Sequence, residues 1–379
     1  MQTRDISEVK QIWIDESVKD GIVARNVIER AAPGVAISFT DRPQEILNDF
    51  RKAGRIEDKH TLLVYKFPGK FLSSCPGSDG MVCCNYFVIN FGYGCLYDCH
   101  YCFLQNYLNN PLITLFGNSD DLFAELGRRM QNQKFHFRVG TGETTDSLVL
   151  EPLSGMAELL VKHFAEIPNA TLELKTKSSN VDTLLNLDHR GRTVVSWSIN
   201  PPHIAEEIEV GTTTIDQRLE AARKVAKAGY RLAFHLDPVI HFEGWESAYH
   251  ALIDRVFATV SPDSVAWISL GSFRYTPGLK TVMQSRFPED WLTRGEMIQG
   301  PDGKYRYFKT IREEMYRSIR EKIQSVDKRL FLYLCMETRR MWEDVFHFVP
   351  ESAKNLDIGF EERRVYLDSL RPSGAGASR

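Results

Sequence analysis

Three cysteines stand close together at positions 95, 99 and 102, in the stretch GYGCLYDCHYCFLQ. Glycines precede the first thiol, so a single loop after a strand can bring all three together. Thiolates are the soft ligands that iron-sulfur clusters need, and a site with three cysteines leaves one iron without a protein ligand. A small chelating substrate can occupy that open iron. The spacing therefore predicts a 4Fe-4S cluster on Cys95, Cys99 and Cys102.

A zinc site is the alternative for the same thiols. His100 or another histidine would complete a tetrahedral set of three cysteines and one histidine. Structural zinc sites usually come as two separated pairs of ligands, whereas these thiols lie on one loop that opens an array of strands and helices. This placement favours an iron-sulfur cluster, and a zinc site stays the alternative.

The elements that must position this loop follow from the hydrophobic pattern. Short apolar runs alternate with amphipathic helical patterns from residue 88 onward, which predicts parallel strands joined by crossover helices. We expect strands at 86–91, 134–140, 171–176, 193–199, 231–239, 265–271 and 329–336. Helical spacing marks 120–130, 154–167, 215–229 and 248–260, with Gly229 at a helix end.

This pattern predicts an α/β protein, with a parallel sheet at residues 85–345 that is either open or curled into a barrel. Residues 1–84 are expected to form an N-terminal cap or lead-in segment, helical over 7–31 and strand-like at 34–39 and 61–67. Residues 346–379 form a C-terminal extension, and its small polar tail from residue 369 is expected to be disordered.

Composition and charge narrow the class of protein. Hydrophobic residues make up 43% and charged residues 26%, which is typical of a soluble globular chain. The net charge of −3 gives the whole molecule no attraction for nucleic acid, so any such contact needs a local patch. The charged N-terminus excludes a signal peptide, and no apolar run reaches the roughly eighteen residues of a membrane span. We expect a cytoplasmic protein whose seven cysteines serve metal binding or catalysis.

Beyond its spacing, the cysteine loop resembles the signature of the radical S-adenosylmethionine (SAM) superfamily. The pattern is CxxxCxxC with an aromatic residue, here Tyr101, before the third cysteine. The resemblance implies that residues 85–345 form a partial (β/α)6 barrel of the TIM type and that SAM chelates the open iron. One electron, from an external donor such as flavodoxin or ferredoxin, then cleaves SAM to a 5′-deoxyadenosyl radical.

Other strand ends are expected to hold SAM. The segment RVGTGETTD resembles the glycine-rich segment with which these enzymes bind the SAM amino group, and this implies roles for Gly142, Glu143 and Thr144. Lys177 is expected to pair with the SAM carboxylate. Ser198 and Asn200 are expected to bond its other polar groups.

Residues from roughly 85 to 310 resemble the spore photoproduct lyase family. These are DNA-repair enzymes that split a methylene-bridged thymine dimer by hydrogen abstraction. The matching pieces are CHYCFLQ at 99–105, TKSSNVDTLL at 176–185, SIN at 198–200 and the long segment 211–249. The resemblance implies a carbon-carbon lyase that acts on a damaged pyrimidine in DNA.

One departure from the family pattern concerns the hydrogen-atom donor. In the family, a cysteine before a Thr-Ser-Asp segment returns a hydrogen atom to the product, but this chain has Glu143 there, followed by Thr-Thr-Asp. Tyr101 matches one tyrosine of the family's radical relay, whereas Phe103 replaces the other. Cys335, at the end of the last predicted strand, is the expected substitute donor, with simple burial as the alternative. A radical SAM enzyme of the same lineage with another substrate therefore stays open.

Further polar residues carry weaker signals. Cys75, Cys83 and Cys84 could join Cys335 around a second metal centre, although adjacent thiols bind one cluster poorly. The segment FHLDPVIHFEGW is expected to place polar liners, His235, Asp237 and His241, in the pocket.

The segment 300–312 predicts a β-hairpin that contacts nucleic acid. Lys304 and Arg306 would hold phosphates, while Tyr305 and Tyr307 would stack on or wedge beside bases. An ordinary hairpin with exposed charges and half-buried aromatic rings is the other interpretation. A non-catalytic zinc protein that binds nucleic acid through this hairpin is the alternative from outside catalysis.

Overall fold

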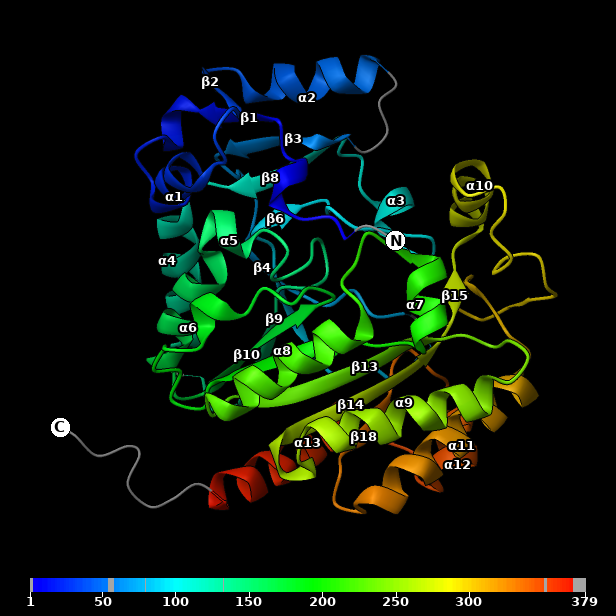
Figure 1. Cartoon of the computed structure of the whole chain (residues 1–379). Helices are drawn as coiled ribbons and strands as arrows, with labels where there is room; N and C mark the ends of the chain where they lie inside the picture. Colours follow the sequence, from blue (N-terminus) through cyan, green and yellow to red (C-terminus); the bar gives the residue numbers. More distant parts are fainter. Residues whose placement is uncertain (1–2, 54–57, 79, 132, 351–352, 371–379) are drawn as a thin grey trace. The chain divides into compact units, whose positions relative to one another are not determined.

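The computed structural model describes residues 3–53, 58–78, 80–131, 133–350 and 353–370 (Figure 1). The chain forms two compact units. The first unit contains Met1–Ser74, Phe87–Thr193 and Glu209–Thr213, and the second contains Cys75–Tyr86, Val194–Ile208 and Thr214–Arg379. The chain passes between the units several times, and the predicted boundaries at 84 and 345 stay predictions.

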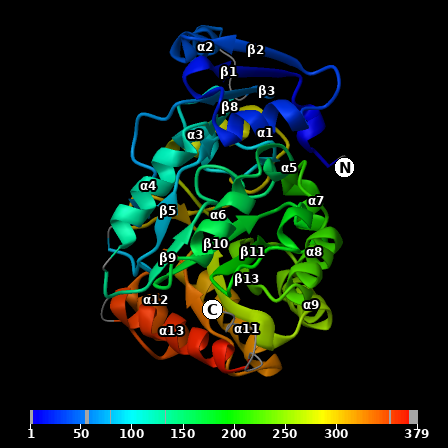
Figure 2. The ribbon, with the colours of Figure 1, turned by 90° about the vertical axis from the view of Figure 1, so that its left-hand side faces the viewer.

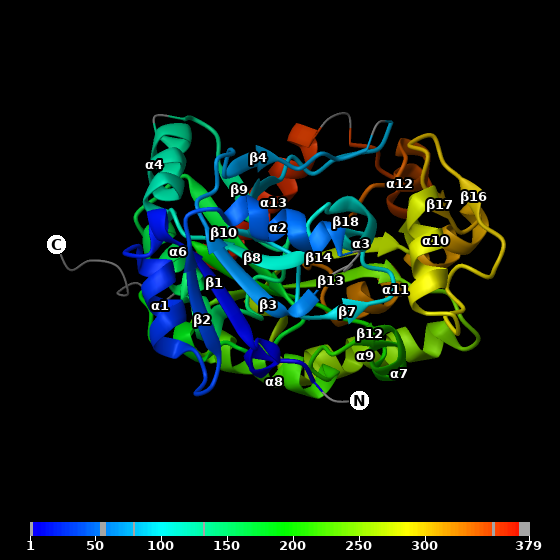
Figure 3. The same cartoon turned by 90° about the horizontal axis from the view of Figure 1, so that it is seen from above.

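A sheet of five strands forms part of the first unit. Its order is β2 (Ala36–Thr40), β1 (Gln11–Asp15), β3 (Asp58–Tyr65), β8 (Leu112–Phe116) and β6 (Gly92–Tyr93). All neighbours are parallel except β6 and β8. Figure 3 shows β1, β2 and β3 side by side, and helix α2 (Pro43–Lys52) packs on β1 (Figure 1).

The prediction of one helical stretch over 7–31 was wrong. Residues 11–15, QIWID, form the central strand β1, and the helix α1 is confined to Ile22–Arg30. Ile12 and Ile14 are almost fully buried, with Trp13 between them less so. This alternation of β-branched and aromatic residues suits a strand between two neighbours, and pairing on both sides decides the outcome.

The first unit also contains the strands that surround the cysteine loop. Strand β5 (Phe87–Ile89) is parallel to β9 (Phe137–Gly140), which is parallel to β10 (Ala170–Thr176), while β4 (Leu72–Ser74) is antiparallel to β5. The helices between them are α3 (Leu104–Tyr107), α4 (Ser119–Met130), α5 (Glu151–Ser154) and α6 (Met156–Ala165). The expected strands at 86–91, 134–140 and 171–176 are confirmed.

The second unit continues the alternation of strand and helix. Strands β11 (Thr193–Ser198), β13 (Arg231–Val239), β14 (Val265–Ser272) and β18 (Leu332–Leu334) pair in parallel in that order. Helices α8 (Ile215–Lys227) and α9 (Trp245–Thr259) lie side by side (Figure 2), α11 (Lys309–Val326) packs on α9, and α13 (Ala353–Ser369) packs on β14. Helix α8 ends before Gly229, whose φ of +87° confirms the expected helix stop.

A small antiparallel sheet completes the second unit. Its strands are β15 (Arg274–Tyr275), β17 (Tyr305–Arg306) and β16 (Ile298–Gln299), so the predicted hairpin is confirmed. The predicted disordered tail lies largely outside the described residues. In the part of the chain that the structure describes, no helix combines the length and apolar character needed to cross a bilayer.

Candidate functional site

The cysteine loop begins where β6 ends, and hydrogen bonds to its backbone fix it. Lys59 Nζ donates to the carbonyl oxygens of Cys95 (2.6 Å) and Tyr97 (3.2 Å). Gln105 Nε2 donates to the carbonyl oxygen of Cys99 (3.1 Å). Both side chains bind backbone oxygens and so hold the loop in place.

A short strand pair ties the loop to a distant segment of the first unit. Strand β7 (Asp98–Cys99) is antiparallel to β12 (Glu209–Val210), with Cys99 opposite Glu209. Gly94 enters the loop with φ of +84°, and a Cβ there would lie 3.2 Å from the carbonyl oxygen of Leu112. Glycine is therefore required where the chain turns away from β6.

The three thiols lie in a protected setting and form no disulfide. Burial raises the pKa of Cys95 to about 12, and the charge of Asp146 adds to the rise. Burial also raises the pKa of Cys99 well above its ordinary value, although Lys177 opposes this. Such thiols keep their protons until a metal displaces them. A small cavity beside the loop is lined by Cys95 and Cys102.

This donor set fits an iron-sulfur cluster. Cys95, Cys99 and Cys102 offer three soft ligands from one loop, and the ammonium groups of Lys59 and Lys177 supply compensating positive charge. These cysteines are the residues that would hold the cluster. Within the described ranges, no group of three or more His, Cys, Asp and Glu side chains is close enough together to hold a single metal ion.

Tyr101 lies between the second and third cysteines and has a carboxylate partner. Its hydroxyl donates to Glu209 Oε1 at 2.5 Å, and Glu209 is almost fully buried. The ammonium of Lys177 stands 5.6 Å from the centre of the Tyr101 ring, which is within the range of a cation–π contact. The structure therefore brings two predicted site residues, Tyr101 and Lys177, to the cysteine loop. Sequence reasoning missed Glu209.

The glycine-rich segment after β9 is held by one carboxylate. Asp146 accepts from the backbone N–H groups of Leu148 and Val149 (both 2.9 Å) and of Lys177 (2.8 Å). It also accepts from the hydroxyl of Thr176 (2.6 Å). Asp146 thus joins the end of β9 to the end of β10, and sequence reasoning had given it no role.

Three predicted SAM ligands lie in this segment. A Cβ on Gly142 would lie 2.8 Å from Cβ of Lys175, so glycine permits the close packing of the loop on β10. The hydroxyl of buried Thr144 donates to the carbonyl oxygen of Gly92 (2.9 Å), so this side chain fixes the loop and only its backbone is left for a ligand. Glu143 is partly exposed and, among the described residues, has no hydrogen bond or ion pair.

Ser198 and Asn200, the other predicted SAM ligands, belong to the second unit. Both are buried, and the carbonyl oxygen of Ser198 accepts from Arg218 Nη1 (2.9 Å). Asn200 Oδ1 accepts from the hydroxyl of Tyr249 (2.7 Å), which in turn accepts from the backbone N–H of Ile240 (2.9 Å). Their contact with a cofactor stays a prediction.

Cys335 follows β18 in the second unit. Its backbone N–H donates to Leu270 at 2.7 Å, and Arg274 Nη2 donates to its Sγ at 3.8 Å. Arg274 pairs with Asp237, one of the expected pocket liners. Cys335 is partly exposed, so it is not merely a buried hydrophobic residue.

The predicted nucleic-acid contacts of the hairpin need correction. Arg306 is 2% exposed and forms an ion pair with Asp302 at 2.7 Å, so its guanidinium has no free path to a phosphate. Tyr307 is buried, and its hydroxyl accepts from the backbone N–H of His241 (3.2 Å). Lys304 and Tyr305 are partly exposed and stay candidates.

Comparisons with known proteins agree on one family. A family model described as "Spore photoproduct lyase" matches residues 69–337. The spore photoproduct lyase of Bacillus subtilis (strain 168) is 32% identical over 231 residues, which cover 60% of this chain and 66% of that enzyme. The one from Geobacillus sp. (strain Y412MC61) is 30% identical over 272 residues, which cover 69% and 76%.

Solved structures extend the similarity to the fold. A spore photoproduct lyase double mutant with bound AdoMet and dinucleoside spore photoproduct has a TM-score of 0.74 and 26% identity, over 86% of this chain and 98% of that chain. A single mutant with the dinucleoside has a TM-score of 0.75 and 27% identity, with the same coverage. The predicted α/β class with a curled, partial-barrel parallel sheet is confirmed.

The fold and the cysteine loop together define a radical SAM enzyme, whose cofactors are a 4Fe-4S cluster and SAM. The family model spans most of the chain, and the relatives are lyases. The chain belongs to the spore photoproduct lyase family. The predicted lyase-like enzyme is confirmed, and these relatives do not favour the non-catalytic zinc protein.

Proposed function

We propose that the chain repairs DNA by abstracting hydrogen from a methylene-bridged thymine dimer, so that the bridge between the two bases is split. The observation that carries this proposal is the three-thiol loop with Tyr101 and Lys177 beside it, in a family whose solved members bind dinucleoside spore photoproduct. When bound to the cluster, SAM supplies the 5′-deoxyadenosyl radical that starts the reaction.

Residues of the first unit bind and orient SAM in this proposal. Lys177 pairs with the SAM carboxylate, because its ammonium lies beside the cysteine loop. Glu143 accepts from the SAM ammonium, which suits a partly exposed carboxylate with no partner among the described residues. Gly142 lets the backbone approach the ligand. Contact of Ser198 and Asn200 with SAM stays a prediction.

Cys335 returns the hydrogen atom to the product in this proposal. The matching family cysteine is Glu143 here, and a carboxylate cannot donate a hydrogen atom. In the return step the S–H bond of Cys335 breaks, a C–H bond forms on the thymine methylene, and sulfur keeps one unpaired electron. One electron from the external donor and one proton then restore the thiol. The end of a strand in a parallel β/α sheet is the usual place for such a group.

The partners follow from the same chemistry. Damaged DNA is the substrate, and an external one-electron carrier such as flavodoxin or ferredoxin supplies electrons. The cytoplasm is the compartment that provides such carriers and keeps seven cysteines reduced. Lys304 and Tyr305 on the hairpin are the proposed contacts to DNA.

A second candidate function rests on Glu143. A radical SAM enzyme of the same lineage that acts on another substrate, such as a modified nucleotide, needs no thiol at this position. The partly exposed carboxylate would then bind or orient that substrate.

The test offers a dinucleoside spore photoproduct to anaerobically reconstituted enzyme with SAM and dithionite in deuterium oxide. Thiol hydrogens exchange with solvent, so we expect a restored thymidine dinucleotide that carries one deuterium. The Cys335→Ala variant should form little of this labelled product, while Cys75→Ala serves as a matched control. SAM cleavage without lesion reversal would favour the second function. Repair by Cys335→Ala at the parent rate, with deuterium still incorporated, would remove Cys335 as the donor.

A further inference from the structure

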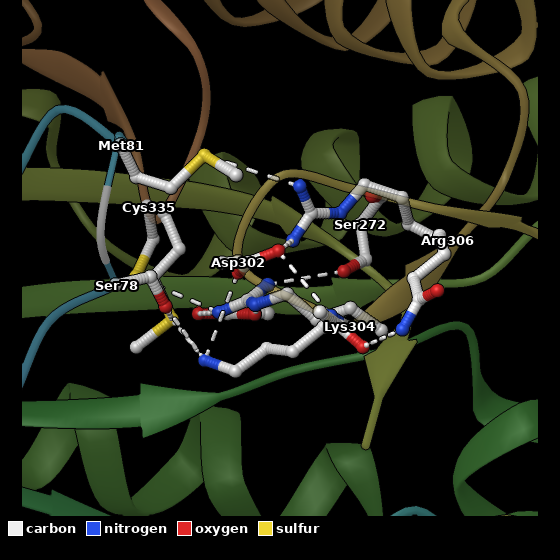
Figure 4. A network of polar contacts seen from close by, with 12 residues as sticks. Ser78, Met81, Ser272, Asp302, Lys304, Arg306 and Cys335 are labelled. Atoms are coloured by element: carbon white, nitrogen blue, oxygen red, sulfur yellow. Dashed lines mark hydrogen bonds and ion pairs between the residues drawn. The ribbon is translucent and has the colours of Figure 1, made fainter. Parts of the chain in front are cut away.

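The ion pair between Arg274 and Asp237 lies beside Cys335 in the second unit. Arg274 and Asp237 meet through two contacts, Nη1 to Oδ1 at 3.0 Å and Nη2 to Oδ2 at 3.3 Å. Arg274 Nη1 also donates to the carbonyl oxygen of Ser272 at 3.0 Å. The second guanidinium nitrogen, Nη2, reaches Cys335 Sγ at 3.8 Å. Figure 4 shows Cys335 and Ser272 within this network.

Strand ends bring these groups together. Asp237 lies near the end of β13, Ser272 ends β14, and Cys335 directly follows β18, the next strand in the sheet. Arg274 is in β15, which starts two residues after β14. Three adjacent strands of one unit therefore set the position of the guanidinium relative to the thiol.

Gly271 leaves the space that the ion pair fills. A Cβ on residue 271 would lie 2.6 Å from Asp237 Oδ1 and 2.9 Å from Arg274 Nη1. Any side chain there would push the carboxylate and the guanidinium out of their present positions. Glycine at position 271 is therefore needed for the ion pair to take its present position next to β14.

We propose that Asp237 and Arg274 are positioning residues that keep Cys335 as a protonated thiol with its S–H hydrogen turned away from the guanidinium. This inference rests on the proposed donor role of Cys335. Arg274 donates a hydrogen to sulfur, so the thiol hydrogen is not used in that contact and is available to a substrate radical. Asp237 offsets the guanidinium charge, which by itself would favour the thiolate. A thiolate has no hydrogen atom to return.

The electrostatics of the surroundings show why a carboxylate is needed beside this thiol, because the contact between Arg274 and Cys335 by itself favours the thiolate. Burial by itself would lower the pKa of the Arg274 guanidinium, but Asp237 and then Cys335 raise it above its ordinary value. Lys304 and Cys83 also interact electrostatically with Cys335. Lys304 Nζ lies 3.6 Å from the sulfur of Met336, the next residue. Asp237 balances the guanidinium of Arg274, and Asp302 lies 4.0 Å from the ammonium of Lys304.

The test measures the alkylation rate of Cys335 by iodoacetamide from pH 6 to pH 10. Full-length reconstituted enzyme is used without substrate, and mass spectrometry follows the peptide that carries Cys335. Only the thiolate reacts, so the midpoint of the profile reports the ionisation of this thiol. Cys83 is an internal reference, because its pKa is lowered to about 6, chiefly by a hydrogen bond with Cys84.

Removing the carboxylate charge should shift the profile downward. We expect the midpoint of Asp237→Asn to fall by about one pH unit, and that of Asp237→Glu to stay near the parent value. Arg274→Gln removes the cation, so its profile should move to higher pH. A purely structural role would not give shifts of opposite sign. The control Asp254→Asn removes an exposed carboxylate of α9 that pairs with Lys322 and should change nothing.

Repair assays separate this inference from the proposed function. Asp237→Asn should lose solvent deuterium from its product increasingly as the pH rises from 7 to 9, because its Cys335 becomes a thiolate. Unchanged alkylation profiles in both Asp237→Asn and Arg274→Gln would overturn the inference, even if Cys335 is the donor. Full repair by Cys335→Ala would overturn the donor role instead, whatever the alkylation profiles are.

Discussion

Tyr101 donates a hydrogen bond of 2.5 Å to Glu209, and this contact joins the cysteine loop to strand β12. The two residues are 108 positions apart in the chain. A phenol that loses an electron must also lose its proton, and a carboxylate already in hydrogen-bond contact can accept that proton. We therefore expect the pair to let Tyr101 lose an electron and its proton together, without an exposed charge.

Glu209→Gln should slow lesion repair by about tenfold or more, because an amide oxygen accepts a proton poorly. Tyr101→Phe should cause a similar loss, and the double variant should lose no more than either single one. The measurement is repair turnover, with iron content and SAM binding as controls that should stay at parent values. Parent turnover in Glu209→Gln together with a large loss in Tyr101→Phe would show that the carboxylate only supports the backbone.

Cluster binding should depend on the three loop cysteines and not on the other thiols. Cys99→Ala should lose the broad visible absorption and most of the iron after anaerobic reconstitution, because we expect each cysteine of the loop to bind one iron. Cys84→Ala is the matched control and should retain roughly four irons per chain. Loss of iron from Cys84→Ala would instead indicate a second centre that includes Cys75, Cys83 and Cys335.

Much of the fold could be predicted because buried parallel strands have a distinct pattern. Segments such as TLELKT and VAWISLG are buried along nearly their whole length, so they appear as short apolar runs between amphipathic helices. The failure at QIWID has the opposite cause. Charged residues surround this short segment in the sequence, and its two parallel neighbours come from positions 36–40 and 61–64.

The candidate site was predictable where spacing along the chain sets the geometry. The cysteine loop and Gly142 are local features of this kind. Glu209, Asp146 and the Arg274–Asp237 pair are not, because their partners arrive through strand pairing and loop closure. For Arg306 the local element was predicted and the side-chain contact was not. The hairpin forms as expected, but the ion pair with Asp302 turns the Arg306 side chain inward.

Stability should fall as pH rises from about 4.5 to 7, through Glu151. Burial raises the pKa of this carboxyl to about 7, although hydrogen bonds from the N–H groups of Ala157 and Glu158 and the hydroxyl of Thr183 act against the rise. The folded protein thus holds a proton that the unfolded chain releases above its ordinary pKa of 4.5. The linked loss is about 3 kcal/mol at most between these pH values.

Glu151→Gln should remove this contribution, because an amide does not titrate. At pH 5 the free energy of unfolding of this variant should be lower than that of the parent, because one hydrogen bond from the N–H groups of Ala157 and Glu158 is lost. Between pH 5 and pH 7.5 it should fall less than the free energy of unfolding of the parent does. Urea unfolding followed by circular dichroism at several pH values measures both chains. Glu166→Gln, which removes an exposed carboxylate paired with Arg190, should keep the parent slope. An equal slope in Glu151→Gln would mean that another group carries the effect.

Arg306 should contribute to stability and not to DNA binding. Its guanidinium and the Asp302 carboxylate are both 2% exposed and meet at 2.7 and 2.8 Å. Although burial acts to raise it, the pKa of Asp302 lies below its ordinary value, because the hydrogen bond and charge of Arg306 outweigh burial. Arg306→Met removes the guanidinium from this buried carboxylate and leaves it the more distant ammonium of Lys304 at 4.0 Å, which should lower the free energy of unfolding by about 3 to 5 kcal/mol. The double variant with Asp302→Asn should recover part of that loss, since it also removes the buried negative charge.

DNA binding gives the decisive comparison for the same variants. The salt dependence of affinity counts the phosphates that the protein neutralises, so a lost phosphate contact reduces the slope by about one. We expect the double variant Asp302→Asn/Arg306→Met to bind damaged duplex with the parent slope, measured by fluorescence anisotropy at temperatures where it is folded. Lys304→Gln should show the reduced slope, because Lys304 is partly exposed and lies on the same hairpin. A reduced slope in the double variant would mean that Arg306 leaves Asp302 and reaches a phosphate when DNA binds.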